Sequence, residues 1–221
     1  HGIMRVRGFT QDDGHIFCLE DQILDECVAY TTLLQKVYAA FGFTETRVYL
    51  STRPEKSIGT DEMWSRAEQS LREALEAESI PYDVNPGDGA FYGPKIDFCV
   101  LDAMKREWQL STAQLDFSMP ERFELTYIDN SGQPARPVMI HRAILGSLER
   151  FIGILVEHTG GAFPLWLSPQ QVRFVTVTDR QNDYAAAATA TLRARGLRVA
   201  ADLRNEKLGF KIREAQQAKV P

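Results

Sequence analysis

The 221-residue chain has an ordinary globular composition, with 44% hydrophobic and 25% charged residues and a net charge of −5. This composition excludes collagen-like and low-complexity chains, and no apolar run approaches the ~18 to 20 residues that a membrane-spanning helix needs. Three cysteines without CxxC spacing argue against a disulfide framework and against a zinc site of cysteines alone. We therefore expect a protein of the reducing cytoplasm, without a membrane partner. A first residue of His rather than Met suggests a processed protein or a fragment.

The charge is unevenly distributed along the chain. Between Arg193 and Lys219 eight basic residues face three acidic ones, so this segment is basic and the rest of the chain is acidic. A basic terminal module could attract phosphate groups. A solvated helix face of mixed charge remains the alternative.

The first third of the chain predicts strands and two long helices. Apolar residues at three- and four-residue steps favour a helix that ends at Gly42, and acids in a first turn favour a second helix. The expected elements are strands over Met4–Phe9 and His15–Cys18, a helix over Glu20–Phe41, a strand over Phe43–Leu50 and a helix over Asp61–Ala77.

The middle of the chain predicts an antiparallel meander, because no crossover-length connection separates its β-rich segments. The expected strands are Lys95–Leu101, Glu107–Phe117, Phe123–Ile128 and Pro137–Ile140. A helix is expected from Arg142 to Glu157, with Gly146 on it.

A linker around Phe163–Pro169 precedes a change of pattern. Strands over Val172–Val177 and Leu197–Leu203 alternate with helices over Gln181–Arg195 and Lys207–Lys219. This β-α-β-α order predicts a small parallel α/β domain. We expect an α+β domain over residues 1–166 and the α/β domain over residues 167–221.

Several polar residues share a face of a predicted element. Arg5 and Arg7 lie two apart on a strand and suit phosphate or carboxylate recognition, although strand arginines are often simply solvated. Gln11 and Asp13 could hold a small polar group or ammonium, or the Asp could cap its own turn. His15 and His141 are too far apart in sequence to form a metal motif by themselves.

Further candidates lie in the second half of the meander. Tyr92 and Lys95 flank a glycine-rich approach that suits an anion, although an ordinary turn is the alternative. Strand alternation predicts that Gln109 and Ser111 share one face and that Gln114 and Asp116 share the opposite one. Arg150 lies one helical turn beyond Gly146.

Five segments together resemble the threonyl-tRNA synthetases, which are class II aminoacyl-tRNA synthetases. They are MRVRGFTQDDGHIFC, LSTRPEKSIGTDEMW, GAFYGPKIDF, RPVMIHRAILGSLERF and ADLRNEKLGFKIREA. The resemblance covers the chain from residue 1 to residue 221, and such a set is far more specific than any single pattern. It implies a class II antiparallel sheet with helices, followed by an anticodon-binding domain.

The resemblance also implies roles for individual residues. The implied reaction joins threonine to ATP, accompanied by Mg²⁺, as threonyl-adenylate and transfers threonine to its tRNA; Arg5, Lys95 and Arg150 are the implied catalytic residues. By the same resemblance, His15 and His141 hold one catalytic Zn²⁺. The other matched residues are Arg5, Phe9, Gln109 and Arg150 for ATP, Gln11, Asp13, Tyr92, Lys95 and Gln114 for threonine, and Asn205 and Arg213 for the anticodon.

Parts of the family pattern are not matched. The family's third zinc ligand is a cysteine upstream of this region, and Cys18, Cys27 and Cys99 do not match it. The family is a homodimer, but its motif 1 interface, the first half of motif 2 and the editing domains are not matched. The alternatives are another class II synthetase, a non-catalytic RNA-binding paralogue and a zinc hydrolase, the last without support from a compact motif such as HExxH.

Overall fold

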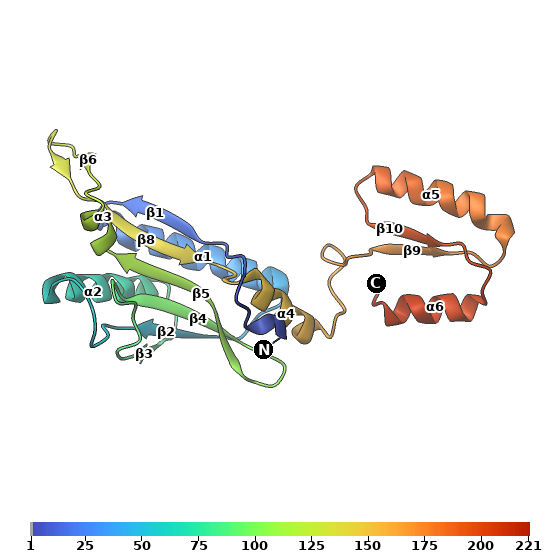
Figure 1. Ribbon diagram of the computed structural model, residues 1–221, viewed down its shortest axis with the longest axis horizontal. Helices are drawn as coiled ribbons and strands as arrows, with labels where there is room; N and C mark the ends of the chain where they lie inside the picture. Colours follow the sequence, from blue (N-terminus) through green and yellow to red (C-terminus); the bar gives the residue numbers. More distant parts are fainter. Residues whose placement is uncertain (1) are drawn as a thin grey trace. The chain divides into compact units, whose positions relative to one another are not determined.

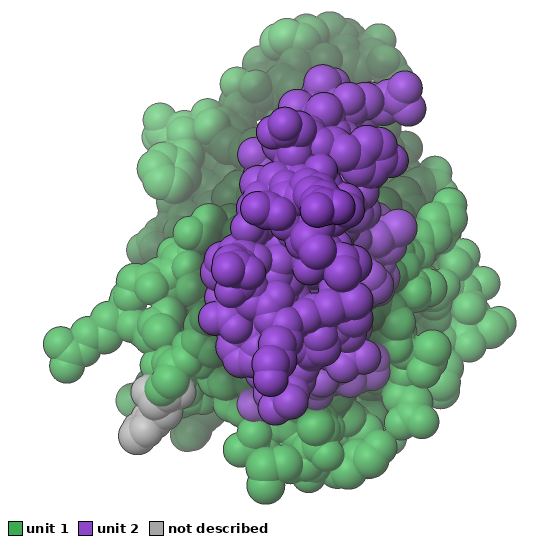
Figure 2. Space-filling view, turned by 90° about the vertical axis from the view of Figure 1, so that its right-hand side faces the viewer, with its two compact units in different colours: residues 1–154 green, residues 155–221 purple. Residues whose placement is uncertain are grey.

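The computed structural model describes residues 2–221. The chain divides into two compact units, residues 1–154 and 155–221 (Figure 2). The division lies within helix α4 (Leu148–Thr159). The domain boundary that we expect after residue 166 stays a prediction. Among the described residues, no helix is both long enough and apolar enough to cross a bilayer.

Within the described part of unit 1, a six-stranded sheet has the order β1-β8-β5-β4-β2-β3 (Figure 1). Neighbouring strands are antiparallel except for β2 and β3, so the predicted antiparallel α+β class is confirmed. The strands are β1 (Gly14–Cys18), β2 (Thr46–Ser51), β3 (Asp83–Asn85), β4 (Lys95–Leu101), β5 (Glu107–Asp116) and β8 (Val138–Ala143).

Helix α1 (Ile23–Phe41) covers one face of this sheet, and α2 (Asp61–Ala77) packs beside it. The Tyr30 hydroxyl donates to the Ala143 carbonyl at 2.9 Å, and the Tyr38 hydroxyl hydrogen-bonds Ser111. Both tyrosines are buried on the helix stripe that faces the strands. Because side chains alternate along a strand, the strand residues on either side of those that face α1 point to the other face of the sheet.

The strand expected over Met4–Phe9 does not form. A 3-10 helix covers Gly2–Met4, and the following residues run beside the start of α4 instead of along β1. The Thr10 carbonyl accepts from the Leu148 amide at 2.8 Å, and Gln11 forms an isolated antiparallel β-bridge with Ser147. Within the predicted strand itself, the Met4 carbonyl accepts from Nε of Arg150 on α4.

The helix expected from Arg142 begins six residues later, at Leu148, because β8 continues to Ala143. Gly146 therefore lies in the turn before α4, with a positive φ of 66°. The strand expected over Phe123–Ile128 is also mostly wrong. A short helix α3 (Ser118–Arg122) follows β5, and only β6 (Tyr127–Ile128) pairs, with β7 (Pro134–Ala135).

Unit 2 has the predicted β-α-β-α order, with parallel strands β9 (Val172–Val175) and β10 (Val199–Asp202). Helix α5 (Asn182–Ala194) connects them, and α6 (Leu208–Gln217) follows β10. The parallel pairing follows from the crossover helix, since parallel strands need a connection of that length.

Candidate active site

A row of four polar residues crosses unit 1 on the face of the sheet opposite α1. In register, Lys95 pairs with Gln114, Gln114 with His141, and His141 with His15. Side chains of directly opposed residues lie on the same face, about 4.5 to 5.5 Å apart at Cβ. Four residues spread from position 15 to position 141 thus become neighbours.

The two histidines lie edge to face, with ring centroids 4.8 Å apart. Nε2 of His141 lies 2.9 Å from Oδ2 of Asp116, whose carboxylate is fully buried. Asp116 also accepts the backbone amides of Ser118 and Met119, so its direction is fixed by the start of α3. Sequence reasoning identified Asp116 only as a face neighbour of Gln114.

These histidines are suitable as two nitrogen donors of a zinc site, which usually takes three protein ligands when catalytic. The partner of Nε2 of His141 is a carboxylate, which is the usual arrangement behind a ligating imidazole. Among residues 2–221, no cluster of three His, Cys, Asp or Glu side chains could hold a metal ion. The residues present therefore fit an incomplete zinc site.

Tyr92 joins the row near Lys95, on the side of β4. Nζ of Lys95 lies 2.8 Å from Oδ2 of Asp97. Partial burial lowers the pKa of Lys95, but the hydrogen bond and charge of Asp97, assisted by Asp88, raise it above its ordinary value. The Tyr92 hydroxyl donates to Gln114, and burial together with the charges of Asp116 and Asp13 raises the Tyr92 pKa. Both groups thus keep their protons near neutral pH.

A β-bulge in β5 corrects the face predicted for Gln109. The register shifts between Phe98 and Cys99, whose partners are Ser111 and Gln109, so Leu110 is the extra residue. Gln109 consequently lies on the side of Gln114, and its amide donates to Asp97 at 2.5 Å. Ser111 points instead to Tyr38 of α1. Bulges re-aim side chains in this way, and simple alternation cannot predict them.

Gln114 of this row lines a pocket of about 430 Å³. Six of the predicted site residues line it: Arg5, Phe9, Gln11, Gln109, Gln114 and Arg150. The structure thus places the predicted nucleotide residues beside part of the predicted amino-acid residues. The pocket is large enough for a small ligand of the kind that such clefts usually bind.

Asp12 holds the wall of this pocket, a role that sequence reasoning missed. Its carboxylate accepts three consecutive backbone amides, those of Ile144, Leu145 and Gly146, at 2.9 to 3.1 Å. A Cβ on Gly146 would lie 2.2 Å from the Leu110 carbonyl oxygen, so the turn packs directly on the bulge. In the sequence, the only indication of this role for Asp12 was that an Asp of this segment could cap its own turn.

Arg150 and Glu149, at the start of α4, complete this wall. Nε and Nη1 of Arg150 donate to the Met4 and Gln109 carbonyls, each at 3.1 Å, and its guanidinium lies 5.5 Å from the Trp108 ring centroid. Glu149 accepts the Thr10 amide at 3.0 Å. The guanidinium is thereby held at the rim of the pocket.

The two predicted anticodon residues are exposed in unit 2. Asn205 lies in the connection between β10 and α6, and Arg213 lies on α6. Arg204 forms ion pairs with Asp202 and Glu214 beside them. This unit therefore presents polar groups on an exposed turn and helix.

Two known family models match this chain, and their bounds correspond closely to the two units. The model of the tRNA synthetase class II core domain (G, H, P, S and T) matches residues 1–159, and that of an anticodon binding domain matches residues 171–221. The sheet, the candidate site and this match define the class: the chain belongs to the class II tRNA synthetases.

Particular relatives are threonine–tRNA ligases, so the resemblance indicated by the sequence motifs is confirmed. The ligase of Leptothrix cholodnii is 59% identical over all 221 residues, which cover 35% of that protein. The RNA binding domain of threonyl-tRNA synthetase from Cryptosporidium parvum is 44% identical, with a TM-score of 0.95, and the chain covers 55% of it. A putative threonyl-tRNA synthetase of Aeropyrum pernix is 32% identical, with a TM-score of 0.87 and 53% of its chain covered. The chain thus spans about a third of its curated relative.

Proposed function

We propose that this chain forms most of the amino-acid-activating site, and part of the anticodon-reading domain, of a threonine–tRNA ligase. The observation that carries the proposal is the row Lys95–Gln114–His141–His15, which reaches the pocket lined by Phe9 and Arg150 at Gln114. Relatives named threonine–tRNA ligase support the choice of threonine as substrate. The activity belongs to the whole protein that contains this chain.

The nucleotide half of the site binds ATP with its Mg²⁺. Phe9, whose side chain is half exposed beside the pocket, stacks on adenine, and Gln109 contacts the nucleotide. Arg5 and Arg150 neutralise phosphate charge as the threonine carboxylate attacks the α-phosphorus and pyrophosphate leaves. Such a reaction needs positioning and charge stabilisation and requires no protein nucleophile.

The amino-acid half orients threonine against this phosphate. Asp13 supplies a negative charge for the ammonium group, and Gln11 and the protonated Tyr92 hydroxyl contact the polar groups. The Lys95 ammonium attracts the carboxylate, and Gln114 forms the floor of the amino-acid pocket. The hydrogen bond from Tyr92 to Gln114 and the ion pair from Lys95 to Asp97 keep these groups in place.

His15 and His141 hold a zinc ion, with a third donor from outside these 221 residues. When bound, Zn²⁺ supplies a Lewis acid for the amino and hydroxyl groups of threonine, which rejects valine far more strongly than an apolar pocket could. Asp116 holds the ring of His141 through Nε2. Nδ1 of that ring would then be available as the nitrogen donor to the ion.

Unit 2 reads the tRNA. Asn205 and Arg213 contact unpaired anticodon bases, which are the usual targets of sequence-specific RNA recognition. The basic segment between Arg193 and Lys219 attracts the phosphates. Dimerisation, as in the family, would use surfaces outside this chain. A cytoplasmic location is supported by three buried, free cysteines.

Threonine-dependent exchange between ATP and pyrophosphate tests the proposal in the whole protein. We expect exchange with threonine, its loss on chelation of zinc, and its loss in His15→Ala. His158→Ala is the control: this histidine is exposed and lies outside the site, so we expect exchange to be unchanged. Exchange with serine or proline but not threonine contradicts the proposal, and tRNA binding without any exchange favours the non-catalytic paralogue.

A further inference from the structure

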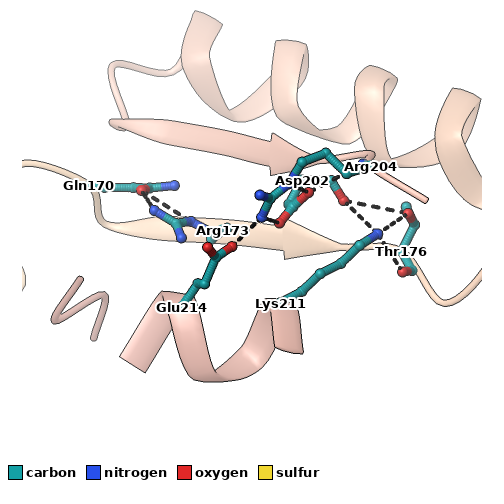
Figure 3. Close-up of polar contacts among 7 residues, drawn as sticks. All are labelled: Gln170, Arg173, Thr176, Asp202, Arg204, Lys211 and Glu214. Carbon is teal, nitrogen blue, oxygen red and sulfur yellow. Dashed lines mark hydrogen bonds and ion pairs between the residues drawn. The ribbon is translucent and has the colours of Figure 1, made fainter. Parts of the chain in front are cut away.

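Unit 2 buries a lysine that none of the predicted roles uses. Lys211 is 1% exposed, and its ammonium lies where β9 and β10 end (Figure 3). Nζ donates to the Thr176 carbonyl at 3.0 Å, to the Thr176 hydroxyl at 3.3 Å and to the Asp202 carbonyl at 3.2 Å. The three N–H donors of a lysine are thus matched by three oxygens.

Burying an ammonium is costly unless it is paired or fully hydrogen-bonded. All three oxygens bonded to Lys211 are neutral, and the negative charge of the nearby Asp202 carboxylate also attracts the ammonium. An apolar side chain in the same place would avoid the cost of burying charge, but it could not bind both strand ends at once. The pattern is therefore typical of a residue that holds the ends of β9 and β10 in a fixed arrangement.

Lys211 also holds helix α6. Among the ten described residues of α6 it alone is buried, while Leu208, Phe210 and Ile212 remain 36%, 40% and 42% exposed. Lys211 is thus the residue of α6 that reaches deepest into the unit. Arg213, two residues further on, lies about 200° around the helix and so points away from the strands.

The same contacts fix the turn that carries Asn205. Asp202 ends β10, and its carboxylate accepts the Arg204 amide at 3.2 Å and the Arg204 guanidinium at 2.8 and 2.6 Å. Arg204 also binds Glu214 of α6, and Figure 3 shows this outer ion pair beside the buried ammonium. The turn and the helix are therefore joined twice, once inside the unit and once on its surface.

We propose that Lys211 is a positioning residue for RNA recognition. It fixes the turn with Asn205 and the helix face with Arg213 in one relative arrangement, which matches unpaired bases of a single-stranded RNA loop. Lys211 itself does not touch the RNA. This inference rests on the proposed function, because it requires unit 2 to read an RNA loop.

The test compares two RNA stem-loops, one with the threonine anticodon and one with a changed anticodon, for binding to the 221-residue chain. Lys211→Met keeps the length of the side chain and removes the ammonium. We expect the ratio of the two dissociation constants to fall about tenfold, as for the loss of one base contact. Lys207→Met removes an equal charge from an exposed lysine beside α6. It should weaken the binding of both RNAs to the same extent and leave the ratio of their dissociation constants unchanged.

Two further variants separate positioning from general stability. Thr176→Val removes one acceptor of Lys211 and should lower the ratio to a smaller extent, which decides the question if Lys211→Met fails to fold. In the double variant Lys211→Met/Asn205→Ala, the ratio should fall by less than the two single losses combined, because Lys211 acts in part through Asn205.

Each outcome has a distinct meaning. Wild-type discrimination that persists in folded Lys211→Met or Thr176→Val overturns the inference and leaves the proposed function intact. A wild-type chain that binds both stem-loops equally contradicts the anticodon role of unit 2, and with it this inference. Threonine-dependent exchange in the whole protein then still tests the ligase activity separately.

Discussion

The two units fix their functional residues by different means. In unit 1, the decisive hydrogen bonds join residues far apart in the chain, as between Asp12 and Ile144, 132 positions away. In unit 2, the corresponding bonds join nearer residues, 35 positions apart for Lys211 and Thr176 and two for Arg204 and Asp202. The candidate active site thus depends on the whole sheet, whereas the candidate RNA-reading surface depends on one turn and one helix.

The largest effect is expected from Gly146→Ala in unit 1. The added Cβ would lie 2.2 Å from the Leu110 carbonyl oxygen, at a positive φ of 66°. We expect about 4 kcal/mol lower free energy of unfolding, from overpacking and backbone strain together. Urea denaturation of the chain measures it.

Gly132→Ala is the matched control for this substitution. Gly132 also has a positive φ, of 79°, but its Cβ would meet nothing within 4 Å. Only the backbone term of about 1 kcal/mol should remain. Equal losses in the two variants would show that the turn does not pack tightly on the bulge.

Asp12→Ala tests the long-range clamp itself. Three backbone amides lose their acceptor, so we expect about 3 kcal/mol lower free energy of unfolding and weaker ATP binding in the whole protein. Asp129→Ala, which frees two amides in an exposed hairpin, should cost less than about 1 kcal/mol because water replaces the carboxylate. Calorimetric ATP binding that is unchanged in Asp12→Ala would contradict the role of the clamp in shaping the pocket.

Asp116→Asn tests whether the buried carboxylate orients His141. We expect about 10- to 100-fold weaker zinc binding by the whole protein, since carboxylates behind ligating histidines typically contribute this much. Competition with a chelator measures the dissociation constant of zinc. Asp102→Asn alters another buried carboxylate, bonded to Arg106 and Trp108, and should leave zinc affinity unchanged.

The smallest effect concerns the pH dependence of unit 2. Arg204 is the main cause that lowers the pKa of Asp202 from 3.8 to about 2, against the effect of burial. Because the folded pKa lies below the unfolded one, this stabilisation is fully present above about pH 4 and is lost as the pH falls toward 2. Acid denaturation of Asp202→Asn should therefore show a shallower fall over this window. An unchanged slope would show that the contact with Arg204 does not stabilise the folded unit.

Much of the local structure could be predicted because it depends on local patterns. Helix α2 and strand β4 begin and end at the predicted residues, and Gly42 ends α1 as expected. The predicted start of α4 at Arg142 is wrong because Arg142 belongs to β8. Pairing of β8 with both β1 and β5 outweighs the local helix propensity. The strand predicted over Met4–Phe9 does not form, and the Met4 carbonyl accepts instead from Arg150 of α4.

The sequence by itself determined the two-part pattern of elements and the residue types of the site, because periodicity and motifs are properties of neighbouring residues. Only the tertiary structure decided which of these residues meet. The register of four strands forms the row from Lys95 to His15, and the bulge at Leu110 turns Gln109 to the same face of the sheet. Asp12 and Lys211 gain their roles only through oxygens and amides that the fold brings to them, since a hydrogen bond requires proximity that no local pattern encodes.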